Sequence, residues 1–114
     1  MIKYVPKLWG SEEWLVNTDK YCAKRLNLIQ GYQCSLHMHK KKDETFYILG
    51  GTVELDIKIN DYTFVIKLRE GKQIRIKPGV YHRFRSLTPK SVILEVSTPH
   101  SDSDSYRLEV SRKI

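Results

Sequence analysis

The segment 52–68 limits most strongly what this chain can fold into. Polar and apolar residues alternate along 52–59, which places four apolar side chains on one face: Val53, Leu55, Ile57 and Ile59. Such alternation is typical of a β-strand with one buried side. Asn60-Asp61 then favours a two-residue hairpin turn, and residues 62–68 return with their apolar side chains in phase. The segment therefore predicts two antiparallel strands.

Short strands separated by turns are indicated along most of the remaining chain. The further strands that we predict cover residues 45–49, 73–76, 81–87, 91–97 and 106–110. The sequence lacks a long segment with the 3.6-residue period of an amphipathic helix. Strands this short, with turns about every 8–12 residues, are typical of a β-sandwich or barrel. We therefore predict an all-β fold.

The size and composition are those of one globular domain. The chain has 114 residues, of which 40% are hydrophobic and 29% charged. We expect a single domain over residues 1–114. We also expect it to be cytoplasmic and not membrane-bound, because the N-terminus lacks the apolar core of a signal peptide and apolar runs stay far below the ~20 residues of a membrane span. Cys22 and Cys34 are too few for a disulfide framework and are expected to pack as small apolar side chains.

Three of the four histidines form a pattern with a glutamate. His37 and His39 are two residues apart, so their imidazoles point to the same face of a strand. Glu44 follows a short polar loop and could return a carboxylate to the same space, and a third histidine follows in the segment KPGVYHRF. Imidazole and carboxylate are common ligands of transition metals. We predict one divalent transition metal per chain (zinc, manganese, iron or nickel), held by His37, His39, Glu44 and His82.

The alternation of strand residues also predicts what surrounds this metal. Gln33 and Ser35 have the same parity as the two strand histidines, and Phe84 has the parity of His82, so we expect all three to face the ligand. Arg75, as an inward-facing cation, and Lys42, in the loop between the ligands, are further candidates for substrate contacts. His100, in the polar stretch after the last long strand, could edge the cavity from a loop, but a surface position is more common for such a residue and is what we expect.

The opposite face of the His-x-His strand is apolar, with Cys34, Leu36 and Met38. A strand that is apolar on its outer side needs a cover. We expect either the N-terminal segment 1–20, around Trp9 and Trp14, or a second subunit, and we favour a homodimer to which the N-terminal segment contributes.

The net charge of +7 suggests an anionic small molecule, a nucleic acid, or no more than solubility. Helix-turn-helix, zinc-finger and RNA-binding aromatic motifs are lacking, so we expect no nucleic acid partner. The run Lys40-Lys41-Lys42 lies between two candidate metal ligands. It could steer an anionic ligand such as a sugar phosphate, or it could form a solvated turn, and the solvated turn is the more common use of such a run.

Two motifs in this chain resemble those of the cupin superfamily. The first is glycine, five residues, His-x-His, three or four residues, glutamate, six residues and glycine, and it is matched at Gly31, His37, His39, Glu44 and Gly51. The second is matched at Gly71, Gly79 and His82, although Lys77 takes the position of a proline and Ser86 that of an asparagine. The resemblance implies a double-stranded β-helix, the cupin jelly-roll barrel, with the four predicted ligands around one metal.

A weaker resemblance concerns residues 24–95. They are similar to the C-terminal cupin domain of bifunctional mannose-6-phosphate isomerase/guanylyltransferases, through stretches such as SLHMHKKKDETFYILGGTVEL and PGVYHRF. This implies an isomerase acting on a sugar or sugar phosphate, in which a metal polarises oxygen atoms and Glu44 and His82 move protons. An iron-dependent dioxygenase and a non-catalytic binder of a small molecule are the alternatives.

Overall fold

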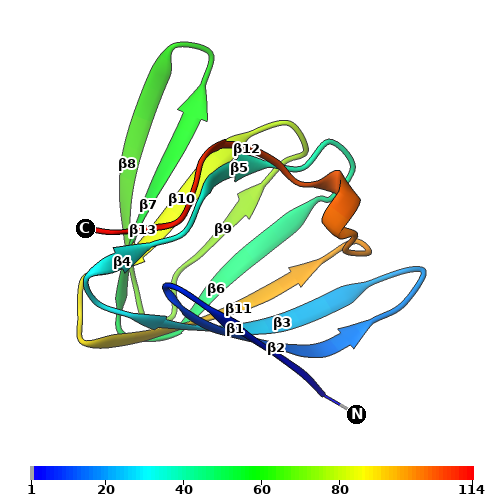
Figure 1. Cartoon of the computed structure of the whole chain (residues 1–114), viewed down its shortest axis with the longest axis horizontal. Helices are drawn as coiled ribbons and strands as arrows, with labels where there is room; N and C mark the ends of the chain where they lie inside the picture. Colours follow the sequence, from blue (N-terminus) through cyan, green and yellow to red (C-terminus); the bar gives the residue numbers. More distant parts are fainter. Residues whose placement is uncertain (1) are drawn as a thin grey trace.

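The computed structural model describes residues 2–114 and is built almost entirely of β-strands (Figure 1). The elements are β1 (Lys3–Lys7), β2 (Gly10–Asn17), β3 (Cys22–Ile29), β4 (Tyr32–Gln33), β5 (Leu36–Met38), β6 (Glu44–Gly50), β7 (Thr52–Ile59), β8 (Tyr62–Arg69), β9 (Gln73–Ile76), β10 (Tyr81–Ser86), β11 (Lys90–Ser97), the short 3₁₀ helix η1 (Asp102–Asp104), β12 (Tyr106–Glu109) and β13 (Arg112–Lys113). The predicted all-β fold is confirmed. No helix within residues 2–114 is long and apolar enough to cross a membrane.

The strands form two antiparallel sheets that lie face to face as a jelly-roll barrel (Figure 1). The first sheet has the order β1-β2-β3-β11-β6-β9. In the second, β10 pairs with β4, β5 and β7, while β12 lies beside β5, β13 beside β4, and β8 beside β7. Strands that are distant in the sequence therefore become neighbours, and β11 lies between β3 and β6.

The inward faces of four strands change from charged to apolar along their length. Inward positions pair a polar residue with an apolar one two residues away: Lys24 with Leu26, Glu44 with Phe46, His82 with Phe84, and Glu95 with Ile93. All eight side chains are buried. The apolar members belong to the hydrophobic core, and the polar members gather at one end of the barrel. This layering is what places a charged cavity above an apolar core.

The β4–β5 segment contains one extra residue that changes which side chains face inward. Gln33 lies opposite Arg85 and His37 opposite His82, so this segment advances four residues while β10 advances three. An extra residue of this kind, as in a β-bulge, reverses the inward–outward alternation. Gln33 consequently lies beside Arg85 on the outer face, with Oε1 3.5 Å from its guanidinium. Cys34, which we expected outside, packs in the core and accepts the Phe84 N–H on its sulfur (3.2 Å).

The N-terminal segment extends the first sheet of the same chain. β1 and β2 form a hairpin beside β3, and its turn carries Trp9, which is 4% exposed. The Trp9 ring packs edge-to-face on Phe84, with ring centroids 4.9 Å apart. This segment therefore contributes to the barrel itself, and the predicted homodimer remains a prediction.

The predicted hairpin at 52–68 is present as β7 and β8, and it projects beyond the barrel (Figure 1). Asn60 has a φ of 56°, as a two-residue hairpin turn requires. The base of the hairpin is buried at Val53 and Leu68, but Ile59 and Phe64 near the tip are about half exposed. The alternation predicted the strand faces correctly, although burial ends where the hairpin leaves the barrel.

Candidate metal centre and its cavity

Three histidines converge at the charged end of the barrel. His37 comes from β5, His39 follows that strand, and His82 comes from β10 directly opposite His37. One ring nitrogen from each lies within 4.8 Å of the others. This confirms that the strand parity brings the three imidazoles to one point, as the spacing predicts.

The same hydrogen-bonding pattern orients all three imidazoles. Nδ1 of His37 lies 2.8 Å from the carbonyl oxygen of Ser35, Nδ1 of His39 lies 3.0 Å from that of Asp104, and Nδ1 of His82 lies 3.0 Å from that of Val80. A carbonyl only accepts, so each Nδ1 carries the proton and donates it. Each Nε2 is then left with a lone pair, which is the arrangement that a metal-binding histidine needs.

Glu44 lies against two of these histidines. Its carboxylate oxygens are 3.3 Å from Nε2 of His82 and 3.5 Å from Nε2 of His39. Within residues 2–114, both Glu44 Oε2 and His82 Nε2 are buried without a hydrogen-bond partner. Because unpartnered buried polar atoms are costly, these two atoms fit the coordination of a cation.

The protonation states also suit a metal. Burial, reinforced by repulsion from His82, lowers the pKa of His37 to about 3, and burial likewise lowers the pKa of His39. Burial alone would raise the pKa of Glu44, but the close contact with His82 and the nearby Lys42 ammonium outweigh it and lower that pKa. Neutral imidazoles and an ionised carboxylate are the forms that bind divalent transition metals.

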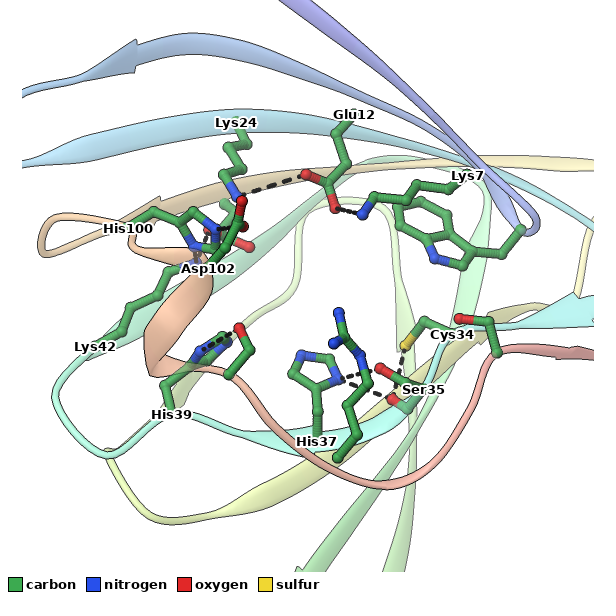
Figure 2. Close-up of a pocket in the computed structure, with 15 residues that line it drawn as sticks. Lys7, Glu12, Lys24, Cys34, Ser35, His37, His39, Lys42, His100 and Asp102 are labelled. Carbon is green, nitrogen blue, oxygen red and sulfur yellow. Dashed lines mark hydrogen bonds and ion pairs between the residues drawn. The ribbon is translucent and has the colours of Figure 1, made fainter.

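Lys42 points into the cavity beside the candidate metal centre (Figure 2). It is 3% exposed, and its Nζ lies 2.6 Å from Glu95 and 3.6 Å from Glu44. The solvated turn expected for the lysine run therefore holds for Lys40 and Lys41, which are exposed, and is wrong for Lys42. The reason is parity, since Lys42 and Glu44 alternate inward at the start of β6.

The pKa values of the two carboxyl groups beside Lys42 shift in opposite directions. Glu44 is held as an anion, whereas burial and the neighbouring Glu44 charge raise the pKa of Glu95 in spite of Lys42. One carboxyl group that stays ionised and another that can accept a proton are the components of acid–base catalysis.

His100 also lines the cavity, which corrects the expectation of a surface histidine. Its side chain is 8% exposed, with Nδ1 3.1 Å from Lys42 Nζ and Nε2 2.9 Å from Asp102. Its ring packs on Trp14 with centroids 5.0 Å apart. Burial and repulsion from Lys42 lower the pKa of His100 to about 4. The sequence left the cavity edge as the less common alternative, because a loop without strand parity carries the residue.

Asp104 ties the C-terminal segment to the loop between the ligands. Its carboxylate accepts the backbone N–H groups of Lys40, Lys41 and Lys42 at 3.0–3.2 Å, while its carbonyl accepts the His39 Nδ1–H. Burial opposes ionisation of Asp104, but the three N–H groups outweigh it and lower its pKa. One residue of η1 thus positions both the loop and a candidate metal ligand.

The predicted substrate contacts fall into two groups. Ser35 and Lys42 line the cavity, and the Ser35 hydroxyl is 3.1 Å from Nδ1 of His37. Phe84 belongs to the core and packs against Trp9, which lines the cavity. Arg75 pairs with Asp43 at 2.6 Å on the outside, because Ile76 is the inward residue opposite Glu44 in the register of β9 with β6. The extra residue in the β4–β5 segment removes Gln33 from the cavity.

Sequence reasoning missed several cavity residues. Lys24 and Glu95 line the wall opposite the histidines, and Arg107 lines the cavity from β12, next to His37. Figure 2 shows Lys24, Glu12 and Lys7 across the cavity from His37 and His39. Lys24 and Glu95 share strand parity with Leu26 and Ile93, so alternation along β3 and β11 could have identified them.

The family model of the cupin domain matches residues 25–98. This chain belongs to the cupin family. Cupins bind metals, and the three histidines could hold one. The oxalate decarboxylase of Bacillus subtilis superimposes with a TM-score of 0.84 over 94% of this chain and 30% of that chain, at 19% identity, which concerns the fold alone.

Two sequence relatives are enzymes of sugar metabolism. The D-lyxose/D-mannose isomerase of Thermosediminibacter oceani is 33% identical over 113 residues, covering 79% of this chain and 62% of that protein. The mannose-1-phosphate guanylyltransferase of Sinorhizobium fredii is 31% identical over 88 residues, covering 77% of this chain and 16% of that protein. The chain thus spans less than two thirds of either relative. The second match agrees with the resemblance to bifunctional isomerase/guanylyltransferases.

Proposed function

We propose that this cupin is a metal-dependent aldose–ketose isomerase that acts on a sugar or sugar phosphate. His37, His39, Glu44 and His82 would hold one divalent transition metal. When bound, such a metal polarises the carbonyl and hydroxyl oxygens of a sugar. The similarity to a sugar isomerase and a sugar-phosphate guanylyltransferase supports a sugar as substrate. The acidic and basic side chains of the cavity support proton transfer.

The observation that carries the proposal is the pair of carboxyl groups on either side of Lys42. Interconversion of an aldose and a ketose removes a proton from one carbon and returns a proton to its neighbour, while a proton also moves between the two oxygens. The enzyme therefore needs a group that both accepts and releases a proton. Glu95 lines the cavity and has a raised pKa, whereas Glu44 is held as an anion.

The roles of this chain's residues follow from their positions. Glu95 takes the proton from the sugar carbon and returns it to the adjacent carbon. Lys42, 2.6 Å from Glu95, stabilises the carboxylate before the transfer and is placed to hydrogen-bond a substrate oxygen. The sequence predicted Glu44 and His82 as the proton-moving residues. Both are buried among the metal-ligand atoms, so Glu95 is the better-placed base and Glu44 the better ligand.

Proton exchange tests this proposal directly. The full chain, loaded in turn with manganese, zinc, nickel or iron, is incubated in deuterated water with D-mannose, D-lyxose or D-mannose 6-phosphate. Loss of the C2 proton signal and appearance of the ketose are followed by nuclear magnetic resonance. Glu95→Gln should abolish exchange while keeping the metal, and Glu54→Gln, on the outside of β7, is the matched control that should leave it intact.

Other results would identify the alternatives. Oxygen consumption that depends on iron, without exchange at C2, would replace the isomerase with a dioxygenase. Sugar binding without exchange for any of the four metals would make the protein a non-catalytic binder. Full exchange activity in Glu95→Gln would refute the role given to Glu95.

A further inference from the structure

The basic side chains on the cavity wall differ in whether they have a partner. Lys24 lies 3.5 Å and Lys7 3.9 Å from the carboxylate of Glu12, and Lys42 lies 2.6 Å from Glu95. Each of these three lysines therefore has a carboxylate partner within the protein, and Lys7 and Lys24 share that of Glu12.

Arg107 is the exception. It lines the same cavity from β12, and within residues 2–114 its guanidinium makes no ion pair or hydrogen bond. The nearest acidic residue along its strand, Glu109, instead pairs with Arg83 at 2.9 Å. Arg107 is thus an exposed cation on a cavity wall, and its charge is uncompensated by the protein.

The position of Arg107 links it to the candidate metal centre. Arg107 pairs with His37 in the register of β12 with β5. Side chains of directly opposite residues lie on the same face of a sheet, with Cβ atoms about 4.5–5.5 Å apart. A ligand bound at the metal would therefore have its remaining atoms within reach of the long arginine side chain. Ser111, on the same wall, adds a hydroxyl group.

We propose that Arg107 binds the anionic group of the substrate, and that the substrate is a phosphorylated sugar. This inference rests on the function proposed above. A guanidinium presents a planar fork of N–H groups that matches the oxygens of phosphate or carboxylate. The anion-binding role expected for Arg75 and the lysine run passes to Arg107, because Arg75 and Lys42 are neutralised by Asp43 and Glu95. A sugar acid offers similar chemistry through its carboxylate, so the experiment must separate the two.

Calorimetric titration of the metal-loaded protein tests the proposal. The probes are D-mannose, D-mannose 6-phosphate and D-mannuronate. The wild type should bind the phosphate more tightly than the neutral sugar. Arg107→Gln should weaken phosphate binding about 10- to 100-fold, as expected for loss of charge-assisted hydrogen bonds, and leave D-mannose binding unchanged. Arg107→Lys keeps the charge without the fork and should give an intermediate affinity.

Arg112→Gln is the matched control, because it removes one exposed positive charge from β13 outside the cavity wall. It should leave all three affinities unchanged. Equal weakening by Arg107→Gln and Arg112→Gln would reduce the effect to general charge and overturn the proposal. Arg107-dependent binding of mannuronate but not of the phosphate would replace the sugar phosphate with a sugar acid.

The two proposals fail in different ways. Arg107-dependent phosphate binding without C2 exchange would retain the binding site and reject the isomerase. C2 exchange on neutral sugars, unaffected by Arg107→Gln and without preference for the phosphate, would retain the isomerase and reject the anion site.

Discussion

Replacing Asp104 with alanine should destabilise the protein and weaken metal binding together. The substitution removes the acceptor of three backbone N–H groups, at 3.0–3.2 Å. The amides of the exposed Lys40 and Lys41 can bond to water instead. The Lys42 amide lies in a buried contact and is left without a partner, which costs about 1–3 kcal/mol. With smaller losses at the other two amides, we expect the free energy of unfolding to fall by about 2–3 kcal/mol and the melting temperature to fall by roughly 10 °C.

The pH dependence of this effect has a definite sign. The folded state lowers the pKa of Asp104, so the stabilisation is present above the unfolded-state pKa of about 3.9 and is lost as the pH falls through the lower folded-state value. The difference between wild type and Asp104→Ala, measured by urea denaturation of the metal-free proteins, should therefore be constant at neutral pH and shrink below about pH 4.

Metal affinity provides the second measurement. The carbonyl of Asp104 accepts the His39 Nδ1–H, so a loosened η1 should disorder this ligand and lower affinity about tenfold or more in a chelator competition assay. Ser103→Ala changes an exposed side chain of the same 3₁₀ helix without touching the loop amides or His100 and serves as the control. A loss below about 0.5 kcal/mol, a size usual for surface substitutions, together with unchanged metal affinity in Asp104→Ala, would refute the reasoning.

Three further predictions concern the metal, the buried ion pair and assembly. The double variant His37→Ala, His39→Ala should stay folded by circular dichroism yet contain no stoichiometric metal by elemental analysis; unchanged metal content would reject the ligand assignment. Lys42→Met leaves the buried Glu95 carboxylate without its partner and should lower the free energy of unfolding by about 3–5 kcal/mol at pH 7, measured by urea denaturation. Because burial raises the pKa of Glu95, lowering the pH should protonate it and restore part of that stability. Light scattering at tens of micromolar, an estimate of a typical working concentration, should show a homodimer, and a monomeric mass would contradict it.

The parts of the fold that the sequence predicted are those governed by regular alternation. The hairpin at 52–68 depends on a period of two residues within each of its strands, and the same period relates His37 in β5 to His39 directly after it. The same rule failed at Gln33 and Cys34, because one extra residue between β4 and β5 reverses the phase and leaves no compositional mark.

Other site features depend on contacts between distant segments. Lys42 has the inward parity of Glu44, but the partner that compensates its buried charge is Glu95 on β11, and the burial of His100 depends on Trp14 on β2. Local patterns cannot report such contacts. Arg75, which we expected in the cavity, points outward because the register of β9 with β6 places Ile76 inward, and it pairs there with Asp43.

The place of β11 between β3 and β6 has a consequence for how the protein folds as it is synthesised. The β7–β8 hairpin forms from neighbouring residues and can assemble early, but β3 and β6 lack the strand between them until residues 90–97 have been made. At about 5–20 residues per second, the interval from the end of β6 to the end of β11 lasts roughly 2–9 s. During that time Leu26 and Ile48 have no apolar neighbour on β11 to cover them. The nascent chain should therefore depend on chaperones until its last long strand emerges.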